Sequence, residues 1–378
     1  MFELFPGNYV WNLSLNIALN TGGQFNEVID ACRPLVPLAA SGDAGTEAYL
    51  RAWEELGDRI AGFAEKDLEN GHRLSAATKF LRASTYYITG ERMQRVGYAP
   101  RTEVYRKAID TFDRFIEHGN EPVQRVEIPF DGGSFPALLS LVPGARPGPL
   151  MIQFNGLDST KEQMWSSPLR TELARRGISL LMVDHPGTGE ALRLRGMTAI
   201  PESERWAAAC LDYLETREEV DIRRVGILGW SLGGYYAPRA AAFEKRLALC
   251  VAWGANYNWG ELQRRRAERE GENPVPHYWE HVQWVWGKDS FEDFMAFAPR
   301  VSLEGVVENI TVPSLTTHGS GDRQIPLEYA YAQYEGSTNS PDRQLHIFTP
   351  EEGGIEHVGG DNMLPAASLI SDWVADRL

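Results

Sequence analysis

Cysteine is scarce in this chain of 378 residues. Its three copies, Cys32, Cys210 and Cys250, are far apart and include no C-x-x-C pair. Disulfide frameworks and zinc sites both need several cysteines at suitable spacing, so the sequence predicts neither. We therefore expect a protein of the reducing cytoplasm.

Long apolar runs and an excess of basic charge are also missing. No run of about 18 apolar residues occurs, and the first residues lack the basic start and apolar core of an export signal. We therefore expect neither a membrane span nor export. The chain has 37 Lys and Arg against 52 Asp and Glu, and its net charge of -15 opposes binding to nucleic acid or to an anionic membrane.

Cofactor motifs are absent as well. The sequence contains no G-x-G-x-x-G pattern opening a strand-helix unit, no Walker loop and no His/Cys cluster with metal spacing. We therefore expect no cofactor and no metal. What is present is a globular composition, with 43% apolar and 24% charged residues, which can bury a large core.

The character of the chain changes near residue 120. Upstream, apolar residues recur at steps of three and four, which predicts amphipathic helices. The expected helices include residues 50–64, 74–87 and 104–116. We expect a helical domain over residues 1–120, either a bundle packed on itself or a cap over a pocket, and a second domain over residues 121–378.

The second domain alternates strand-like and helix-like segments. The expected strands cover residues 123–130, 135–142, 150–154, 178–183, 225–228, 247–253, 314–317 and 345–348. Helix-like stretches such as 203–217 and 364–378 lie between or after them, which predicts an α/β fold with a mostly parallel eight-stranded sheet covered on both sides. Asp131-Gly132-Gly133 is a hairpin signal, so the sheet should begin with an antiparallel edge.

A serine stands in a G-x-S-x-G pattern between an apolar strand and an Ala-rich helix. Gly229 and Gly233 let the strand and the helix approach, and the tight turn should push the Ser231 hydroxyl out over the sheet. The alternative is an ordinary Gly-rich turn. The strand before and the helix after favour Ser231 as a nucleophile.

A serine nucleophile needs an imidazole to take its proton and a carboxylate to orient that imidazole. In this strand-turn-helix architecture the chain order is Ser, acid, His. His357 lies in a loop before the last helix and is favoured over His318 and His346, which sit in or at the ends of strands.

Asp322 follows the penultimate strand and is the favoured acid. Its other interpretation is an Asx-turn residue in ordinary loop chemistry. Glu351, Glu352 and Glu356 compete with it, but their position next to the histidine is typical of a solvated charge cluster.

An oxyanion on the attacked carbonyl needs two fixed donors. The N–H of Leu232, directly after the nucleophile, should supply one, and the N–H of Leu157, in the turn after the third strand, the other. Ser159 to Glu162 matches a helix-capping box, so Asp158 can also be explained as an acidic residue near a helix N-terminus.

Four segments together carry a family resemblance: residues 71–87, 156–162, 184–190 and 229–234. The chain resembles the alpha/beta hydrolases related to 2,6-dihydroxypseudooxynicotine hydrolase, whose relatives include fungal hydrolases that shorten polyketide chains. The resemblance implies an alpha/beta hydrolase fold with an N-terminal helical cap, cleavage of a carbon–carbon bond beside a ketone, and a homodimer. It also implies an additional catalytic acid, and the matching position is Asp158, one methylene shorter.

Aromatic residues are concentrated in residues 254–300, which we interpret as a lid insertion. They can equally be core, and only if they line the pocket do they favour an aromatic or polyketide-like substrate. Three functions remain open: a carbon–carbon bond hydrolase, a carboxylesterase, lactonase or acyl-transferring cyclase, and a non-catalytic protein that binds a partner.

Overall fold

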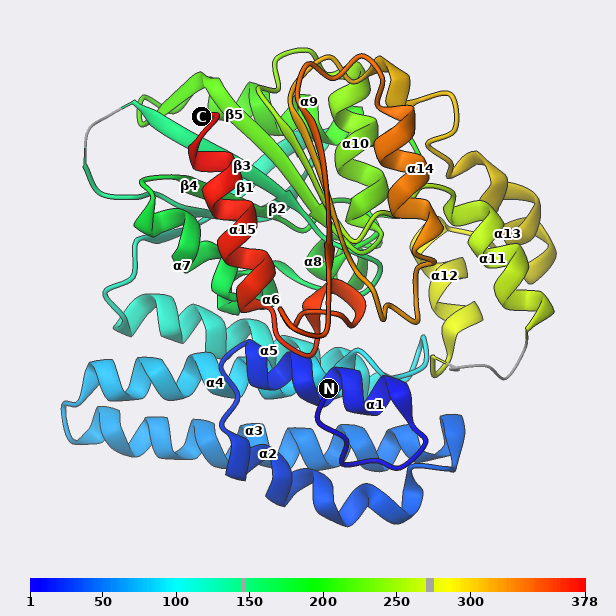
Figure 1. Cartoon of the computed structure of the whole chain (residues 1–378). Coiled ribbons are helices and arrows are strands. Elements are labelled where there is room, and N and C mark those ends of the chain that lie inside the picture. The colour runs from blue at the N-terminus through cyan, green and yellow to red at the C-terminus, as the bar shows by residue number, and fades with distance from the viewer. Residues whose placement is uncertain (145–146, 270–274) are drawn as a thin grey trace. The chain divides into compact units, whose positions relative to one another are not determined.

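The computed structural model describes residues 1–144, 147–269 and 275–378 (Figure 1). The chain divides into two compact units. The helical unit consists of Met1–Val123 with Gly271–His281, and the sheet unit of Gln124–Glu270 with Val282–Leu378. The segment that we interpreted as a lid insertion is therefore divided between the two units. Among the described helices, none combines the length and the apolar content that crossing a bilayer requires.

The helical unit contains five α-helices and two short 3-10 helices among its described residues. They are α1 (Tyr9–Asn20), α2 (Phe25–Cys32), η1 (Arg33–Leu38), η2 (Gly42–Gly45), α3 (Thr46–Glu69), α4 (Arg73–Glu91) and α5 (Ala99–His118). The three helices that the sequence predicted are present as α3, α4 and α5. The apolar stripe of α3 is buried, with Trp53 fully inaccessible to solvent and in ring contact with Tyr49 and Tyr86. The periodicity thus identified the face of α3 that packs in the core.

The sheet unit is built on eight strands in the order β1-β2-β4-β3-β5-β6-β7-β8. They are β1 (Val123–Phe130), β2 (Gly133–Ser140), β3 (Gly148–Phe154), β4 (Ser179–Val183), β5 (Val220–Trp230), β6 (Cys250–Trp253), β7 (Ser314–Gly319) and β8 (Arg343–Phe348). β2 pairs with β4 antiparallel, and every pairing from β4 to β8 is parallel. The predicted mostly parallel, eight-stranded sheet is confirmed.

The β1–β2 hairpin forms at the predicted turn. Asp131 and Gly132 both have positive φ, 48° and 77°. Two consecutive residues of this kind make the turn whose twist matches that of paired strands, and such turns favour an Asp-Gly sequence. The dipeptide therefore determines where the edge of the sheet folds back.

The remaining described residues contain ten further α-helices, of which α12 crosses the boundary between the two units. They are α6 (Lys161–Ser166), α7 (Pro168–Arg175), α8 (Gly189–Arg193), α9 (Glu204–Leu214), α10 (Gly233–Phe243), α11 (Trp259–Glu268), α12 (Tyr278–Trp286), α13 (Phe291–Phe297), α14 (Glu328–Gly336) and α15 (Leu364–Ala375); short 3-10 turns are η3 (Ala298–Arg300), η4 (Val307–Asn309) and η5 (His357–Gly359). Figure 1 shows α7 and α15 on one face, and α9, α10 and α14 on the other. Every residue of β4, β6 and β7 is buried as a result.

Seven of the eight strands differ from their predicted limits, and β5 and β6 show the largest shifts at one end. β5 runs from Val220 to Trp230. The apolar pattern did not predict its first part, because that part carries the charged residues Asp221, Arg223 and Arg224. β6 begins only at Cys250. The longer β5 extends directly to the serine of the G-x-S-x-G pattern.

Part of the aromatic segment packs as core of the sheet unit. The rings of Trp259 and Trp286 are 5.5 Å apart and those of Trp259 and Phe294 are 5.6 Å apart, and all three side chains are buried. These three residues therefore support the core interpretation and give no argument for an aromatic substrate.

Candidate active site

Ser231 lies in the tight connection between β5 and α10. Its φ is +58°, a left-handed conformation that a non-glycine residue adopts only when its surroundings enforce it. The enforcing contacts are backbone hydrogen bonds: Ser231 N–H donates to the Trp253 carbonyl at 3.0 Å, and its own carbonyl accepts from Gly234 N–H at 2.8 Å. The turn thus has the strained geometry that the sequence predicted for a nucleophile.

The glycines of the pattern are required by close backbone contacts. A Cβ atom at Gly229 would lie 2.0 Å from the Gly233 carbonyl oxygen. One at Gly233 would lie 2.9 Å from the carbonyl oxygens of Phe154 and Asn155. β3, β5 and the start of α10 therefore approach one another more closely than any side chain would permit.

His357 begins the η5 turn, which follows β8. Its Nε2 is 2.8 Å from Ser231 Oγ, and its Nδ1 is 2.8 Å from Asp322 Oδ2. Its side chain is 12% exposed, so the ring is shielded but still accessible to solvent. The structure brings the serine, the histidine and the aspartate together in the order expected from the sequence.

Asp322 uses its two carboxylate oxygens for different contacts. Oδ1 accepts from the backbone N–H groups of Gln324 at 2.7 Å and Ile325 at 3.0 Å, while Oδ2 faces His357. Burial opposes ionisation of this carboxyl group, but the charge and hydrogen bond of His357, with His318 and the Ile325 N–H, outweigh burial and hold its pKa below the ordinary value. Asp322 is thus both a turn residue and the partner of His357.

The competing histidines make hydrogen bonds with other groups, although His318 Nε2 also lies 3.7 Å from Asp322 Oδ2. His318 is fully buried and accepts at Nδ1 from Ala255 N–H, so that its Nε2 donates to the Ile325 carbonyl. Burial lowers the pKa of His318 below the ordinary value, which favours the neutral ring. His346 lies on the edge strand β8, and its Nε2 is 2.9 Å from Glu352 Oε1.

Two of the three competing carboxylates, Glu352 and Glu356, are engaged away from His357, and Glu351 is exposed. Glu352 accepts from Thr349 N–H as well as contacting His346. Glu356 pairs with Arg323 at 2.9 Å. No contact of either carboxylate with His357 occurs in the described ranges.

The two residues expected to supply oxyanion donors lie on either side of the serine. Leu232 follows it directly. Leu157 follows Gly156, whose Cα approaches Ser231 so closely that a Cβ there would lie 2.9 Å from Ser231 Cβ and 3.3 Å from Oγ. The backbone turn at residues 156–157 therefore passes directly beside the hydroxyl.

The predicted capping box does not form, and this part of the sequence interpretation is wrong. Thr160, not Ser159, caps α6, with its hydroxyl accepting from Gln163 N–H. The Ser159 hydroxyl is already occupied, because it accepts from Gly156 N–H and from Trp230 Nε1–H. Asp158 is half-buried, and its backbone carbonyl accepts from Arg193. It is therefore not the residue that caps α6.

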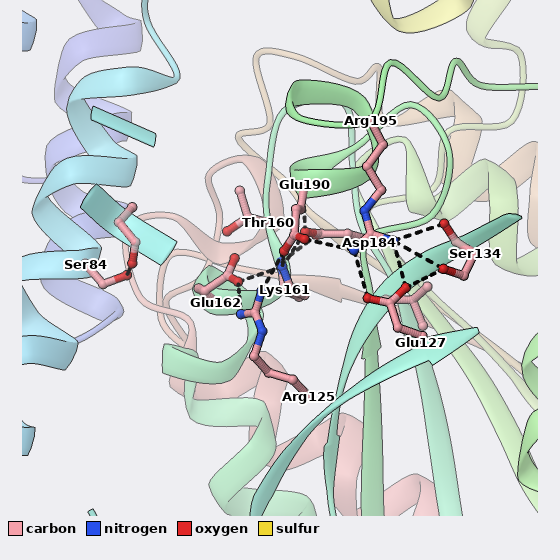
Figure 2. Close-up of polar contacts among 12 residues, drawn as sticks. Ser84, Arg125, Glu127, Ser134, Thr160, Lys161, Glu162, Asp184, Glu190 and Arg195 are labelled. Carbon is pink, nitrogen blue, oxygen red and sulfur yellow. Dashed lines mark hydrogen bonds and ion pairs between the residues drawn. The ribbon is translucent and has the colours of Figure 1, made fainter. Parts of the chain in front are cut away.

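Sequence reasoning assigned no role to a largely buried group of charges around Lys161 (Figure 2). We call it the Lys161 cluster: Lys161, Glu162, Asp184, Glu190 and Arg125. The fully buried Lys161 Nζ contacts Glu162 at 2.7 Å, Glu190 at 2.9 Å and Asp184 at 3.0 Å. Arg125 contacts Glu190 at 2.6 Å. Three carboxylates therefore converge on one ammonium group.

The charges of the Lys161 cluster stabilise one another. Burial alone would lower the pKa of Lys161, but the carboxylates of Asp184, Glu162 and Glu190 outweigh burial and raise it. Burial likewise opposes ionisation of Glu190, yet Lys161 and the neighbouring arginines lower its pKa to about 2. Lys161 and Glu190 therefore carry charge at neutral pH, whereas burial, with the neighbouring Glu162, raises the pKa of Asp184 in spite of Lys161. Four residues of the Lys161 cluster lie in segments 156–162 and 184–190, which were singled out in the sequence for their family resemblance. Nothing in the local sequence indicated that their charges would meet.

A separate groove of about 630 Å³ lies on the sheet unit beside the β1–β2 turn. Its charged lining residues are already paired: Asp131 with Arg205, and Arg195 with Glu127 and Glu190. None of the predicted site residues lines it. Throughout the described part of the chain, no three His, Cys, Asp or Glu side chains are grouped so as to hold a metal ion.

Comparison with known proteins relates this geometry to a family. The model of the alpha/beta hydrolase family matches residues 141–369. The chain is 26% identical to the 2,6-dihydropseudooxynicotine hydrolase of Paenarthrobacter nicotinovorans, covering 86% of this chain and 83% of that protein. It is 27% identical to the 20-hydroxy-prefusarin hydrolase FUS2 of Gibberella moniliformis, with 82% and 83% covered.

Solved structures share the fold. The crystal structure of a 2,6-dihydroxy-pseudo-oxynicotine hydrolase matches with a TM-score of 0.78 and 23% identity, covering 96% of this chain and 95% of the other. The structure of AbyA5 matches with a TM-score of 0.63 and 21% identity, covering 83% and 86%.

Proposed function

The chain belongs to the alpha/beta hydrolase family, and from that premise we propose that Ser231, His357 and Asp322 form a catalytic triad that hydrolyses a small-molecule substrate. The observation that carries the proposal is the pair of 2.8 Å contacts that joins the three side chains through the two nitrogens of His357. A base that contacts both a nucleophile and an orienting acid is the arrangement that activates serine.

The proposed reaction begins when His357 Nε2 removes the proton of Ser231 Oγ as this oxygen attacks a carbonyl carbon. The resulting oxyanion is bound by the N–H groups of Leu157 and Leu232. The bond to the leaving group then breaks, and the leaving carbon or oxygen takes the proton from the imidazolium. Water, deprotonated by His357, releases the acyl group from Ser231 as a carboxylic acid.

We propose that the broken bond is a carbon–carbon bond beside a ketone in an aryl ketone or polyketide-like substrate. The support is the likeness to a 2,6-dihydropseudooxynicotine hydrolase and to a 20-hydroxy-prefusarin hydrolase, together with the family resemblance that segments 156–162 and 184–190 carry. A carbanion is a poorer leaving group than an alkoxide, so protonation must be assisted. Asp158 is the proposed assisting acid, because the family resemblance implies an additional catalytic acid at this position.

The nucleophile is tested with a fluorophosphonate probe, which labels activated serines. We expect the wild-type protein and Ser203→Ala to be labelled, and Ser231→Ala not to be. The Ser203 side chain is buried and donates to the Tyr236 carbonyl, so it controls for the loss of a buried hydroxyl. Failure to label the wild-type protein would favour the non-catalytic, partner-binding function instead.

The bond type is tested with a matched pair of substrates, an aryl 1,3-diketone and the corresponding aryl ester. We expect cleavage of the diketone with release of one carboxylic acid, and a larger loss for the diketone than for the ester in Asp158→Asn. Cleavage of the ester alone would favour the carboxylesterase, lactonase or cyclase function.

We further propose that the protein works without a cofactor, as a homodimer in the cytoplasm, with the helical unit as a substrate-selecting cap. The family resemblance supports the dimer and the cap, and the scarcity and wide spacing of the three cysteines support a reducing compartment. Light scattering should give twice the chain mass of 42.3 kDa. A single-chain mass at working concentration would contradict the dimer.

A further inference from the structure

We propose that Ser159 is a positioning residue, whose hydroxyl holds the backbone turn at Gly156–Leu157 where the Leu157 N–H can bind the oxyanion. This inference rests on the proposed function, because it concerns how the same site stabilises its transition state. It assigns a task to a side chain that interacts with neither the substrate nor the triad in the reaction described above.

The Ser159 hydroxyl makes three hydrogen bonds. It accepts from Gly156 N–H at 3.1 Å and from Trp230 Nε1–H at 3.0 Å, and it donates to Asn155 Oδ1 at 2.7 Å. One donor and two acceptor positions are the full capacity of a hydroxyl group. The residue is 8% exposed, so water has little access to replace these bonds.

Two of these bonds, to Gly156 and to Trp230, join the two parts of the site that must keep their separation. Gly156 belongs to the turn that carries Leu157, and Trp230 directly precedes the nucleophile. A single oxygen atom therefore links the turn to the strand end that bears Ser231. The turn passes so near the nucleophile that a Cβ at Gly156 would lie 3.3 Å from Ser231 Oγ, so a small displacement changes the oxyanion geometry.

The third bond anchors the hydroxyl to the rest of the sheet unit. Asn155 Nδ2 donates to the Val183 carbonyl at 3.0 Å and to Asp184 Oδ1 at 2.9 Å. Asp184 in turn accepts from the backbone N–H of Lys161 at 2.7 Å. Ser159 is thus held by groups that are themselves fixed at the end of β4 and in the Lys161 cluster.

Loss of the hydroxyl should affect the transition state more than the ground state. Oxyanion donors act only when they are fixed about 2.7–3.1 Å from the charged oxygen, and a misplacement of about 1 Å can cost on the order of 10²-fold in rate. In Ser159→Ala, Gly156 N–H, Trp230 Nε1–H and Asn155 Oδ1 all lose a partner. The turn is then free to move while the triad keeps its own contacts.

The experiment measures the rate constant of fluorophosphonate labelling, which needs no knowledge of the natural substrate. Two inhibitors are compared by their protection against labelling: 1,1,1-trifluoro-3-phenylpropan-2-one, which forms an oxyanion adduct with an activated serine, and the matching alcohol, which cannot. In Ser159→Ala we expect the labelling rate and the ketone affinity to fall by about 10- to 10²-fold. The alcohol affinity should stay within about twofold, because it does not use the oxyanion donors.

Ser203→Ala is the matched control, because it makes the same substitution at a buried serine without contact to the turn. It should leave both inhibitor affinities unchanged. If Ser159→Ala does not fold, Ser159→Cys fills the same space with a weaker hydrogen-bonding group and should show the same selective loss to a smaller extent.

Equal losses for ketone and alcohol in the Ser159 variants, or no loss for either, would overturn the positioning role. The same conclusion would follow if Ser203→Ala matched Ser159→Ala. Absence of labelling in the wild-type protein is a different result, since it removes the proposed function and this inference together.

Discussion

In the candidate active site, the two oxygens of a single carboxylate make different hydrogen bonds. Asp322 gives one oxygen to the backbone of its own turn and the other to His357. The turn contacts fix the carboxylate, so that the second oxygen meets the imidazole without rearrangement. The sequence offered a structural and a catalytic interpretation of Asp322 as alternatives, whereas the geometry allows both at once.

The division between the two oxygens of Asp322 leads to a first prediction. Asp322→Asn should lower kcat by about 10⁴-fold, because an amide nitrogen facing His357 favours the wrong tautomer of the imidazole. The amide oxygen can still accept from Gln324 and Ile325, so the turn and the thermal stability should be largely kept. Kinetics of aryl-ester hydrolysis and a thermal melt measure the two effects. Glu352→Gln, which changes a competing carboxylate on the surface, should stay within a few-fold of wild type.

A second prediction concerns pH and Glu190. The pKa of this carboxyl is about 2 in the folded chain, below its usual 4.5, so its stabilising contribution is present above about pH 4.5. The contribution is lost as the pH falls from 4.5 toward 2. Glu190→Gln should therefore be less stable than wild type at pH 7, and the difference should shrink as the pH is lowered through this window. Urea unfolding at several pH values measures it, and a difference that does not vary with pH would contradict the ionised state of Glu190.

At the scale of elements, the Lys161 cluster joins the start of α6, the end of β4 and the start of α8. Lys161 contributes its ammonium group, Asp184 follows β4, and Glu190 lies in the first turn of α8. Asp184 also accepts from the backbone N–H groups of Lys161 and Glu190. The cluster therefore fixes the loops on which the oxyanion turn depends.

A third prediction tests this link. Lys161→Met leaves three carboxylates buried together without their cation, and we expect the free energy of unfolding of the sheet unit to fall by about 3–5 kcal/mol. Arg205→Met removes a cation from an ion pair with Asp131 whose side chains are half exposed, and should cost at most about 1 kcal/mol. Urea unfolding compares the two, and similar losses would mean that the buried cluster is no more important than a surface pair.

Strands were more predictable from the sequence than the buried charges were. The strands of the sheet are short apolar runs whose burial is a local property, and so β3, β4 and β7 lie where the pattern predicts. Lys161 stands in a polar run with Ser159 and Thr160 that has the composition of an exposed helix start. Its burial depends on Asp184 and Glu190, which are distant in sequence, and no local pattern contains that information.

The same limit applies to the residues around the nucleophile. The G-x-S-x-G pattern and the chain order of acid and base are local or topological signals, and the structure brings Ser231, Asp322 and His357 together accordingly. The role of Ser159 depends on the indole of Trp230, which the fold alone brings near. A capping box was the reasonable local interpretation, and tertiary contacts override it.

For the molecule as a whole, neither unit is a single continuous stretch of the chain. The helical unit takes residues 271–281 from the second half of the chain. Within that unit, His277 Nε2 is 3.0 Å from the hydroxyl of Thr46 at the start of α3. The unit is thus built from two separate segments.

A fourth prediction follows from this composition. A chain truncated to residues 124–378 keeps His277, Tyr278 and Trp279 but loses Thr46 and the helices with which they form a unit. We expect chymotrypsin to cleave the truncated chain after Tyr278 or Trp279 much faster than the intact chain, as followed by mass spectrometry. Equal cleavage rates in the two chains would show that these residues do not need the helical unit.

The two-segment helical unit also limits how this protein can be recombined with its relatives. A chimaera made with one crossover near residue 123 would combine the helices of one parent with the 271–281 segment of the other, and so create a mismatched bundle. Transfer of specificity between such enzymes should therefore require a double exchange, in which both stretches come from the same parent.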